Sequence, residues 1–564
     1  MDFKIEIAKL LAAAAEISVE DAAAAVEIPA KKEMGDFAYP CFRLAKVFRK
    51  APPMIAAELI EKIEKPAFIA KMQVVGAYIN FFVDKSVYAE QVLSAVLEQK
   101  ESYGKSDMGA GKTVVIDYSS PNIAKPFHVG HLRSTVIGNA IYKIHEELGY
   151  YCEGINHLGD WGTQFGKLIV AYKKWGSKEA VEKDGIQELM RIYVKFHDEA
   201  EKHPELKMDD EARLWFVKMQ EGDEEALTLW KWFYDISIKE FERVYEMLGV
   251  KFDAYTGESF YNDKMDAVVQ ELKDKNLLKE SEGAMIVGLE DKNMPPCLII
   301  RKDGGTLYAT RDITAALYRK KTYNFDKCIY LTALDQNLHF AQWFEVIHKM
   351  GYDWYKDLIH VPFGLVSLDS GKLSTRHGHV VLMEDLLNQA CAETKRIIEE
   401  KNPNLENKEE IAKQVGIGAV IFNDLYNTRI KDVVFSWERM LNFDGETGPY
   451  VQYALACCIL KRSGLPDVSD IHFEALSDEA SLDVCKLLEA FPDKIKDAAA
   501  KLEPSVVTRH LVAIAQAFNK FYHDNPILSS ELEVRHSHMA VSFSLKTVLK
   551  KGLALLGIEA PEQM

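Results

Sequence analysis

The chain has 564 residues, of which 48% are hydrophobic and 27% are charged. This composition excludes a disordered, collagen-like or small disulfide-rich protein, and the length predicts roughly three or four domains. The formal net charge of −17, from 69 basic and 86 acidic residues, means that any nucleic acid partner must be bound by local basic patches.

Membrane insertion and export are not expected. No uninterrupted apolar run approaches the roughly 18 residues that a membrane-spanning helix needs, and the apolar segment 10–15 follows two acidic residues, Asp2 and Glu6, which argues against a secretory signal. The eight cysteines have neither C-x-x-C pairs nor the spacing of a disulfide framework, so a reducing, cytoplasmic location is expected. The adjacent Cys457 and Cys458 lie in an apolar helical stretch, which favours buried thiols over zinc ligands.

Residues 1–107 predict a small α+β domain, in which the alternating segment 73–83 forms a strand or hairpin. Cations and aromatic side chains interleave between residues 31 and 50. This pattern fits stacking on unpaired bases, and it fits equally well a solvated helix with a core stripe. The members are Lys31, Lys32, Arg43, Lys46, Arg49, Lys50, Phe37, Tyr39, Phe42 and Phe48.

The segment 108–384 alternates between strand and helix patterns, which predicts a parallel sheet with crossover connections. Strands are expected at 113–118, 150–156 and 328–333, helices at 129–149 and 164–175, and a charged helical insertion at 178–248. The segment 297–309 is predicted to be a hairpin that turns at residues 303–305.

From residue 385 onward nearly every segment has helical periodicity, which predicts a helical connection at 385–440 and an all-helical domain at 441–564. Five aromatic residues recur there at helical spacing. Most of them are expected in the core, and an exposed minority can stack on unpaired bases. They are Tyr450, Tyr453, Phe518, Phe521 and Tyr522.

The segment 119–134, with the sequence SSPNIAKPFHVGHLRS, lies between a predicted strand and the first turn of a helix. Backbone N–H groups and the helix dipole favour anions at such a junction. His128 and His131 are three residues apart and can face one anion, and Gly130 lets a ligand approach the backbone. The alternative is that both histidines are capping or core residues.

A second polar segment, 369–378, follows the strand-like residues 360–368 and contains Lys372 and Arg376. Such a loop can bring cations to a triphosphate as charge develops on the leaving group, although alone it also fits a solvated loop. His377 and His379 have no third ligand nearby, so no protein-bound metal is expected.

These two segments resemble known signatures. His128-Val129-Gly130-His131 resembles the HIGH signature, and Lys372-Leu373-Ser374-Thr375-Arg376 the KMSKS loop, of class I aminoacyl-tRNA synthetases. The segments 119–135, 156–166, 307–316 and 443–454 are similar, more narrowly, to arginyl-tRNA synthetases, and the likeness covers nearly the whole chain.

The resemblance implies a fold and a reaction. The catalytic domain, 108–384, is expected to be Rossmann-like; the domain 1–107 meets the tRNA elbow, and the helical bundle 441–564 binds the anticodon. Arginine and ATP give arginyl-adenylate and pyrophosphate, and the arginyl group is then transferred to the 3′ end of the tRNA. Mg²⁺ is expected to travel with ATP, and the protein to act as a monomer.

The resemblance also implies the arginine-binding residues. Asp117 and Asp312 occupy the guanidinium-binding positions, because paired carboxylates match the planar donors of that group. On its own, Asp312 would be interpreted as a helix cap. Ser120 and Asn122 match positions that hold the α-amino and carboxylate end, although Ser-Pro-Asn also predicts a turn. Tyr308 and Gln336 complete the expected pocket.

The ATP-binding and catalytic residues follow from the same resemblance. His128, Gly130, His131 and Lys372 are expected at the phosphates, and the backbone of Gly364 and Val366 at adenine. Ser374 is expected in the catalytic loop. The second lysine of KMSKS is replaced by Thr375, and Lys125 is expected to supply the missing cation. Tyr522 and Met564 are the expected tRNA contacts.

The sequence argues against three alternative functions. A cysteinyl enzyme would need zinc ligands, whose spacing the chain lacks, and a small nucleotidylyltransferase would lack the C-terminal helical domain. A synthetase-like RNA-binding protein without catalysis is disfavoured by the intact His128, His131, Lys125 and Lys372.

Overall fold

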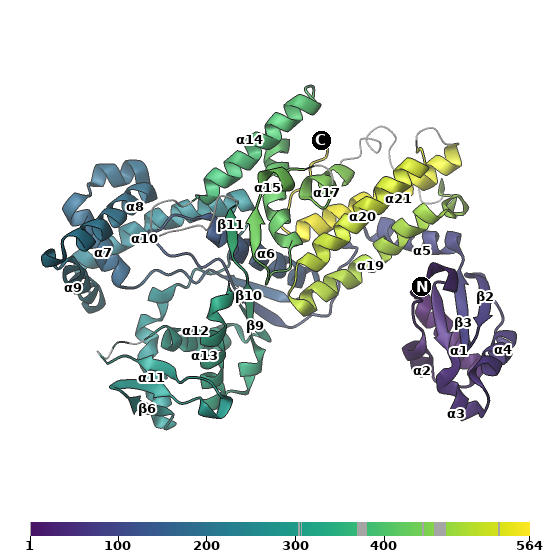
Figure 1. The fold of residues 1–564 in the computed structure, drawn as a ribbon, viewed down its shortest axis with the longest axis horizontal. Coiled ribbons are helices and arrows are strands. Elements are labelled where there is room, and N and C mark those ends of the chain that lie inside the picture. Colours follow the sequence, from purple (N-terminus) through teal and green to yellow (C-terminus); the bar gives the residue numbers. More distant parts are fainter. Residues whose placement is uncertain are drawn as a thin grey trace. The chain divides into compact units, whose positions relative to one another are not determined.

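The computed structural model describes residues 2–302, 305, 307–368, 381–442, 445–455, 470–527 and 531–564. The chain divides into two units (Figure 1). Unit 1 consists of Met1–Tyr103, Cys457–Phe491 and Ala513–Leu549, and unit 2 of Gly104–Ala456, Pro492–Val512 and Lys550–Met564. The residues expected in catalysis all belong to unit 2. Within the described residues, no helix is both long and apolar enough to cross a membrane.

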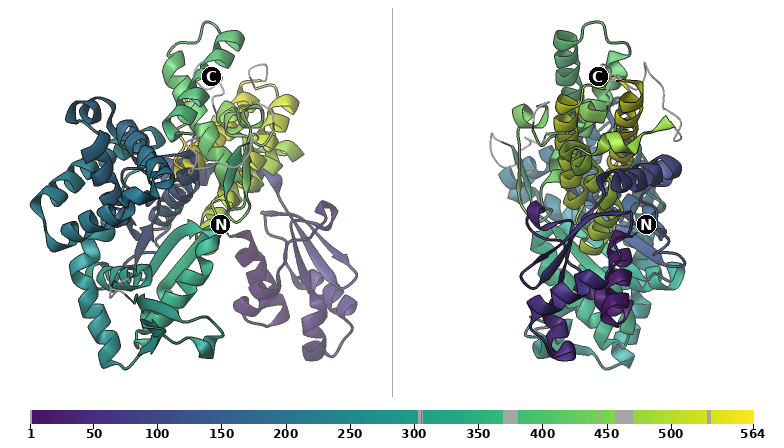
Figure 2. Two further views of the ribbon diagram at one scale, coloured as in Figure 1. Left: turned by 60° about the vertical axis from the view of Figure 1, so that its left-hand side comes forward. Right: turned by 90° about the vertical axis from the view of Figure 1, so that its right-hand side faces the viewer.

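The N-terminal part of unit 1 is built on an antiparallel sheet with strand order β1-β3-β2. The hairpin predicted at 73–83 is confirmed, with Gly76 at its turn in the left-handed region (φ 59°). Helices precede, connect and follow the strands of this sheet (Figure 2). The elements are α1 (Phe3–Ala15), α2 (Val19–Ala25), β1 (Phe37–Pro40), α3 (Ala45–Phe48), α4 (Pro52–Lys62), β2 (Ile69–Val75), β3 (Tyr78–Val83) and α5 (Lys85–Gln99).

The aromatic residues between positions 31 and 50 differ in burial. Tyr39 lies in β1 and is buried, whereas the ring of Phe42 is 54% exposed. The core interpretation therefore holds for Tyr39, and Phe42 is accessible on the surface.

Unit 2 contains a four-stranded parallel sheet with strand order β10-β9-β4-β5. The strands are β4 (Thr113–Asp117), β5 (Tyr151–Ile155), β9 (Lys327–Ala333) and β10 (Leu358–Phe363), and the predicted parallel sheet is confirmed. The side chains of residues 114–116 are all buried, as expected for a strand covered on both faces. Connecting helices include α6 (Leu132–Glu147), α12 (Tyr308–Tyr323) and α13 (Asn337–Lys349). In such sheets ligands bind beyond the carboxyl ends of the strands.

The charged insertion is helical, as predicted. It consists of α8 (Lys178–Lys202), α9 (Met208–Glu221) and α10 (Glu224–Leu248), and it follows α7 (Thr163–Trp175). Helices α7 and α9 approach closely at Gly166, where an added Cβ would lie 1.9 Å from the carbonyl oxygen of Ala212.

The hairpin predicted at 297–309 is wrong. Cys297–Ile300 is strand β8, which pairs with β7 (Ala284–Val287) in an antiparallel sheet of order β6-β7-β8, with β6 at Leu278–Ser281. Residues 303, 304 and 306 lie outside the described residues. The apolar residues from 307 onward begin a helix, because Ala309, Ile313 and Ala316 are buried at helical spacing. Helix α11 (Met265–Asp274) precedes this sheet.

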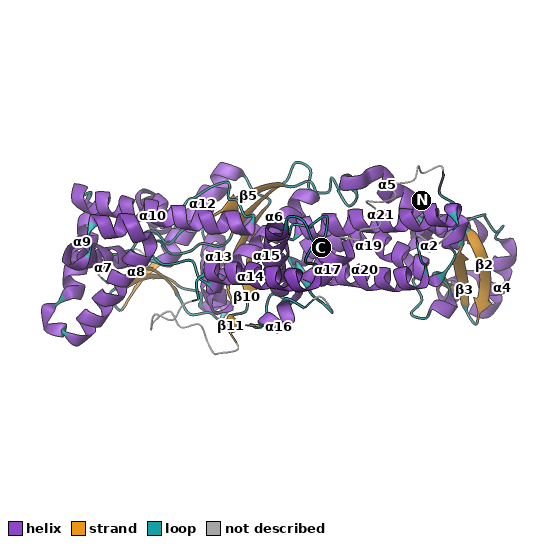
Figure 3. Cartoon of the chain, turned by 90° about the horizontal axis from the view of Figure 1, so that it is seen from above, coloured by secondary structure: helices purple, strands orange, loops and turns teal. Residues whose placement is uncertain are grey.

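The chain after residue 381 is mainly helical (Figure 3). The helices are α14 (Met383–Lys401), α15 (Lys408–Tyr426), α16 (Trp437–Met440), α17 (Gly448–Leu455), α19 (Glu479–Lys501), α20 (Ser505–Asp524) and α21 (Leu532–Leu555). The connection predicted to be helical at 385–440 contains one short strand, β12 (Val433–Phe435), which pairs in parallel with β11 (Val366–Leu368). A three-residue strand leaves too short a pattern to detect in the sequence.

We expect Gly166→Ala to destabilise unit 2 by about 1–3 kcal/mol, because the added methyl group forces α7 and α9 apart. Thermal unfolding should show a lower Tm than for wild type. Thr163→Ala, at an exposed position of the same helix, is the control and should change stability by less than about 0.5 kcal/mol. An unchanged Tm for Gly166→Ala would contradict the close contact.

Candidate active site

The loop between β4 and α6 contains three non-glycine residues in the left-handed region: Ser119 (φ 68°), Ser120 (φ 48°) and Ala124 (φ 61°). Such conformations need support from the surroundings. The Ser119 hydroxyl lies 2.8 Å from the Tyr245 hydroxyl, and the Ala124 N–H donates to Ser237 Oγ at 2.9 Å. Since Tyr245 and Ser237 both belong to α10, the insertion holds this loop in shape.

The two histidines of the first signature form a turn, η4 (Val129–His131), at the start of α6. His128 Nδ1 accepts the Gly130 N–H at 3.0 Å, and His131 Nδ1 accepts the His128 N–H at 3.2 Å. The capping alternative is therefore correct for Nδ1. In the neutral rings the proton must lie on Nε2, which makes each Nε2–H a donor.

Both rings are held neutral. Burial lowers the pKa of His128, with the positive charge of Lys125 as a smaller cause. Burial, followed by the neighbouring His128, lowers the pKa of His131 to about 3. Lys125 itself has a pKa lowered by burial. At neutral pH the site therefore offers hydrogen-bond donors at the histidines, and the two rings carry no charge.

The second signature, with Lys372, Ser374, Thr375, Arg376, His377 and His379, lies outside the described residues. The chain that follows it returns to the first signature. The Val129 N–H donates to the Val381 carbonyl oxygen at 3.1 Å, and the Met383 N–H donates to the Phe127 carbonyl oxygen at 2.9 Å. Residues 381–383, where the described chain resumes, are therefore attached beside the histidines.

The residues expected at adenine differ in what their backbone offers. The Gly364 N–H donates to the Arg429 carbonyl oxygen at 2.9 Å, so it is already used. Val366 belongs to β11, and the Val433 N–H donates to the carbonyl oxygen of Leu365. In a parallel pair, alternate residues of a strand bond to the partner strand. Because Leu365 bonds to β12, the N–H and C=O of Val366 point to the opposite edge of β11.

Asp117, at the end of β4, already contacts a guanidinium of the protein. Its Oδ2 lies 2.8 Å from Arg319 Nη2, and its Oδ1 accepts the Ser120 hydroxyl at 2.9 Å. Arg319 is buried in α12. This pairing fixes the orientation of the carboxylate, which keeps further lone pairs for a ligand.

Asp312 lies within α12, one turn from its start at Tyr308, and is therefore not the residue that opens the helix. The cap interpretation fails because Leu307 is the N-cap residue. The Oδ2 of Asp312 lies 2.5 Å from His339 Nε2. The ring of Tyr308 is 67% exposed at the helix start and is accessible to a ligand.

Asp117 and Asp312 are linked through α12. Arg319, which pairs with Asp117, lies about two turns after Asp312 on α12, and its Nη2 lies 3.5 Å from Nδ1 of the partly buried His157. Burial lowers the pKa of His157, and the charges of Asp117, Asp312 and Asp160 oppose that shift. Asp312 and the arginine that pairs with Asp117 therefore share one face of α12, because residues seven positions apart lie on the same side of a helix.

Glu258 joins this acidic group and was not predicted. Burial raises its pKa to about 7, while Arg311, at 3.1 Å, lowers it, and the charges of Asp160 and Asp312 raise it further. No local pattern marks Glu258, because its partner Arg311 lies 53 positions further along the chain.

The other predicted arginine-binding residues, Asn122 and Gln336, lie shortly after β4 and β9. Asn122 is exposed and forms a bridge with Gly159, where an added Cβ would lie 2.0 Å from Asn122 Oδ1. Gln336 is exposed at the end of η8 (Leu334–Gln336), directly after β9. Among the described residues, no group of three His, Cys, Asp or Glu side chains is placed to hold a metal ion.

The predicted tRNA contacts lie in different surroundings. Phe518 and Phe521 are buried, whereas Tyr522 is 46% exposed, as expected for a residue available to a base. Met564 packs against an apolar cluster that includes Ile398 and Val415. Part of its side chain is therefore used within the protein.

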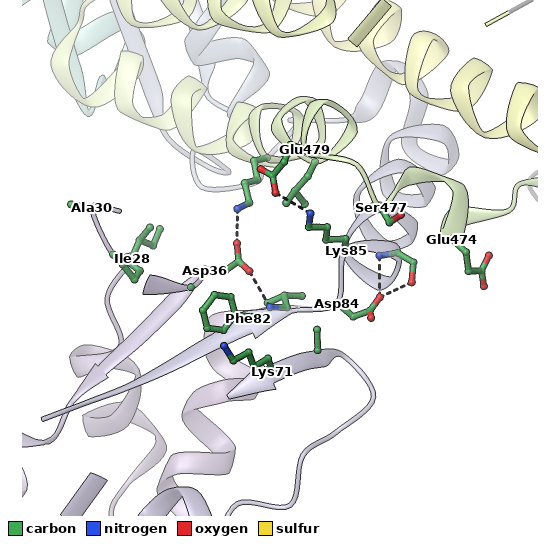
Figure 4. Close-up of a pocket in the computed structure, with 17 residues that line it drawn as sticks. Ile28, Ala30, Asp36, Lys71, Phe82, Asp84, Lys85, Glu474, Ser477 and Glu479 are labelled. Atoms are coloured by element: carbon green, nitrogen blue, oxygen red, sulfur yellow. Dashed lines mark hydrogen bonds and ion pairs between the residues drawn. The ribbon is translucent and has the colours of Figure 1, made fainter. Parts of the chain in front are cut away.

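A separate cavity of about 670 Å³ lies within unit 1 (Figure 4). Two of its three lysines are in ion pairs: Lys486 Nζ lies 2.5 Å from Asp36 Oδ1, and Lys85 Nζ lies 2.9 Å from Glu479 Oε1. The third, Lys71, donates to Gln73. None of the predicted site residues lines it.

Three protein families match successive parts of the chain. Residues 1–83 match "Arginyl tRNA synthetase N terminal domain", residues 92–437 match "tRNA synthetases class I (R), catalytic domain", and residues 451–564 match "DALR anticodon binding domain".

Curated relatives match over the full length. The chain is 58% identical to an arginine--tRNA ligase of Clostridioides difficile and 52% identical to one of Halothermothrix orenii, in each case covering 100% of both chains. The fold is similar to a solved structure of Thermus thermophilus arginyl-tRNA synthetase, with a TM-score of 0.79, 24% identity and 99% of both chains covered.

The lowered pKa of His131 predicts a pH-dependent stability. The folded protein keeps the ring neutral, while the unfolded chain takes up a proton below about pH 6.5. The stability that the folded protein gains from a neutral His131 is therefore complete above about pH 6.5 and is lost as the pH falls toward 3.

We expect the Tm of His131→Gln to fall less steeply than that of wild type between about pH 7.5 and 5. His203→Gln, at an exposed position, should keep the wild-type steepness. Equal slopes for wild type and His131→Gln would show that the ring is not held neutral by burial.

Proposed function

The chain belongs to the class I arginyl-tRNA synthetases and uses ATP to ligate arginine to its tRNA, and from this premise we propose that the site around the loop between β4 and α6 binds both small substrates. The observation that carries the proposal is that Asp117 ends β4, directly before the loop that leads to the histidine signature, and pairs with Arg319 on the same face of α12 as Asp312.

ATP is proposed to lie across the start of α6. The Nε2–H groups of His128 and His131 and the backbone at Gly130 donate to its phosphates, where the helix dipole adds to the attraction. Adenine is proposed to pair with the open edge at Val366. The N–H of Gly364 is already used, and Gly364 contributes by letting the turn between β10 and β11 pass close to the backbone of Lys431.

Arginine is proposed to lie between the two carboxylates. Asp312 keeps one oxygen that His339 does not contact, and this oxygen receives the guanidino group, beside Tyr308 and Gln336. Asp117, held by Arg319, supplies fixed negative charge to the same pocket. Ser120 and Asn122, in the adjoining loop, bind the α-amino and carboxylate end.

The chemical step needs no general base, because the substrate carboxylate is already ionised. Its oxygen attacks the α-phosphorus, the bond from that phosphorus to the bridging oxygen of the β-phosphate breaks, and pyrophosphate leaves with the electron pair. Lys125, and Lys372 and Ser374 of the second signature, stabilise the developing charge. A terminal hydroxyl of the tRNA then attacks the arginyl carbonyl, and AMP leaves. Mg²⁺ bound to ATP would neutralise part of the phosphate charge.

We also propose which domains bind the tRNA and in which state the protein acts. The domain 1–107 binds the tRNA elbow, and the domain 441–564 binds the anticodon, with Tyr522 and Met564 as contacts. The catalytic domain spans 108–384, and the connection 385–440 joins it to the anticodon domain. The protein acts as a monomer in a reducing compartment such as the cytoplasm, in keeping with the six free cysteines among the described residues.

We expect Lys125→Ala to lose about two orders of magnitude or more in the turnover of adenylate formation, because a cation at the transition state is removed. Arginine-dependent exchange of pyrophosphate into ATP, with cognate tRNA present, measures this step. Lys125→Arg should retain more activity than Lys125→Ala. Undiminished exchange by the alanine variant would remove Lys125 from the proposed site.

We expect Asp312→Asn to raise the KM for arginine about 10- to 100-fold, because a charged hydrogen bond to the guanidino group is lost. The KM for ATP should change little in the same exchange assay. Asp274→Asn, at an exposed position on α11, is the control and should leave both constants unchanged. An unchanged KM for arginine in Asp312→Asn would place the guanidino group elsewhere.

A further inference from the structure

Arg133 is a fully buried arginine in the first turn of α6, two residues after His131. Its Nε lies 2.9 Å from Asp424 Oδ1 in α15, and both side chains are at most 2% exposed. Its Nη1 donates to two carbonyl oxygens, that of Gly364 at 3.0 Å and that of Lys431 at 2.6 Å. One side chain therefore joins α6 to two segments that are far apart in sequence, Gly364 and residues 424–431.

Burial of this ion pair is not explained by stability. Removing two charges from water costs several kcal/mol per ion, and apolar replacements of such pairs are often neutral or stabilising. The planar guanidinium, in contrast, presents donors in fixed directions and can bind several acceptors at once, which a lysine cannot reproduce. The contacts of Arg133 therefore point to a role in fixing geometry.

The carbonyl groups that Arg133 contacts belong to a tight crossing of two backbones. An added Cβ at Gly364 would lie 2.6 Å from the carbonyl carbon of Lys431. The Leu365 N–H donates to Asp432 Oδ1 at 2.7 Å, and the pairing of β11 with β12 begins at the next residue. The position of β11, and with it the open edge at Val366, is thus set by this crossing.

We propose that Arg133 is a positioning residue for ATP, which fixes the adenine-binding edge of β11 relative to the phosphate-binding histidines of α6. The inference rests on the proposed ATP site and extends it to a residue that does not touch the nucleotide. The histidines and Arg133 share the first turns of one helix, so Arg133 transmits the position of α6 directly to the strand. A displacement of about 1 Å between the two halves of the ATP site can cost roughly 100-fold in rate.

Two variants test this role. Arg133→Lys keeps the charge beside Asp424 and loses the fork that binds two carbonyl oxygens. Arg133→Met combined with Asp424→Leu removes both buried charges, so that neither remains unpaired. The matched control is Lys551→Met combined with Glu147→Leu. It removes an ion pair of 2.7 Å at the other end of α6, with side chains 16% and 8% exposed.

The measurements are the KM for ATP, the KM for arginine and kcat in tRNA-dependent pyrophosphate exchange, together with the Tm of each variant. We expect both Arg133 variants to raise the KM for ATP about 10-fold or more and to lower kcat, with the KM for arginine within about twofold of wild type. The control pair should change Tm without changing the KM for ATP.

Three results would overturn the inference. The first is a KM for ATP that stays at the wild-type value in both Arg133 variants. The second is a parallel rise of the KM for ATP and the KM for arginine. The third is an equal rise of the KM for ATP in the control pair. His131→Gln separates these results from a failure of the proposed ATP site. If that variant raises the KM for ATP and the Arg133 variants do not, the positioning role alone is wrong. If none of them raises it, the ATP site lies elsewhere and the inference is wrong with it.

Discussion

The hydroxyl groups of Tyr245 and Ser237 hold the loop between β4 and α6, and the rest of the site depends on that contact. Ser119, Ser120 and Ala124 adopt left-handed conformations that cost about 1–3 kcal/mol each for residues with a side chain. The hydrogen bonds from α10 to Ser119 and Ala124 compensate part of this cost. The insertion at 178–248 is thus part of the active-site framework and not a surface addition.

The loop separates two regions of opposite electrostatic character. On one side, the carboxylates of Asp117, Asp312 and Glu258 lie along α12, where Arg319 pairs with Asp117 and Arg311 pairs with Glu258. On the other side, the neutral rings of the histidine signature and Lys125 face the start of α6. A cationic amino acid and an anionic nucleotide can therefore bind a few residues apart without competing for the same groups, which suits a reaction that joins them.

The sequence predicted the elements that carry strong periodicity and missed the pairings between distant segments. The apolar runs of β4, β5 and β9 and the helical pattern of the insertion were enough to identify the parallel sheet and α8–α10. The sequence did not predict the three-residue β12 or the start of α12 at Tyr308, because short apolar runs fit a strand and a helix equally well. Within the site, the partners of the predicted aspartates escaped detection. Arg319 lies 202 positions after Asp117 and His339 27 positions after Asp312, and no local pattern encodes such contacts.

A crystal structure with a non-hydrolysable analogue of arginyl-adenylate would test the central claim most directly. The account predicts the guanidino group at the oxygen of Asp312 that His339 does not contact, the phosphate analogue within hydrogen-bonding distance of Nε2 of His128 and His131, and adenine along the edge of Val366. A guanidino group that binds away from Asp312 and Asp117 would contradict the proposed basis of arginine recognition.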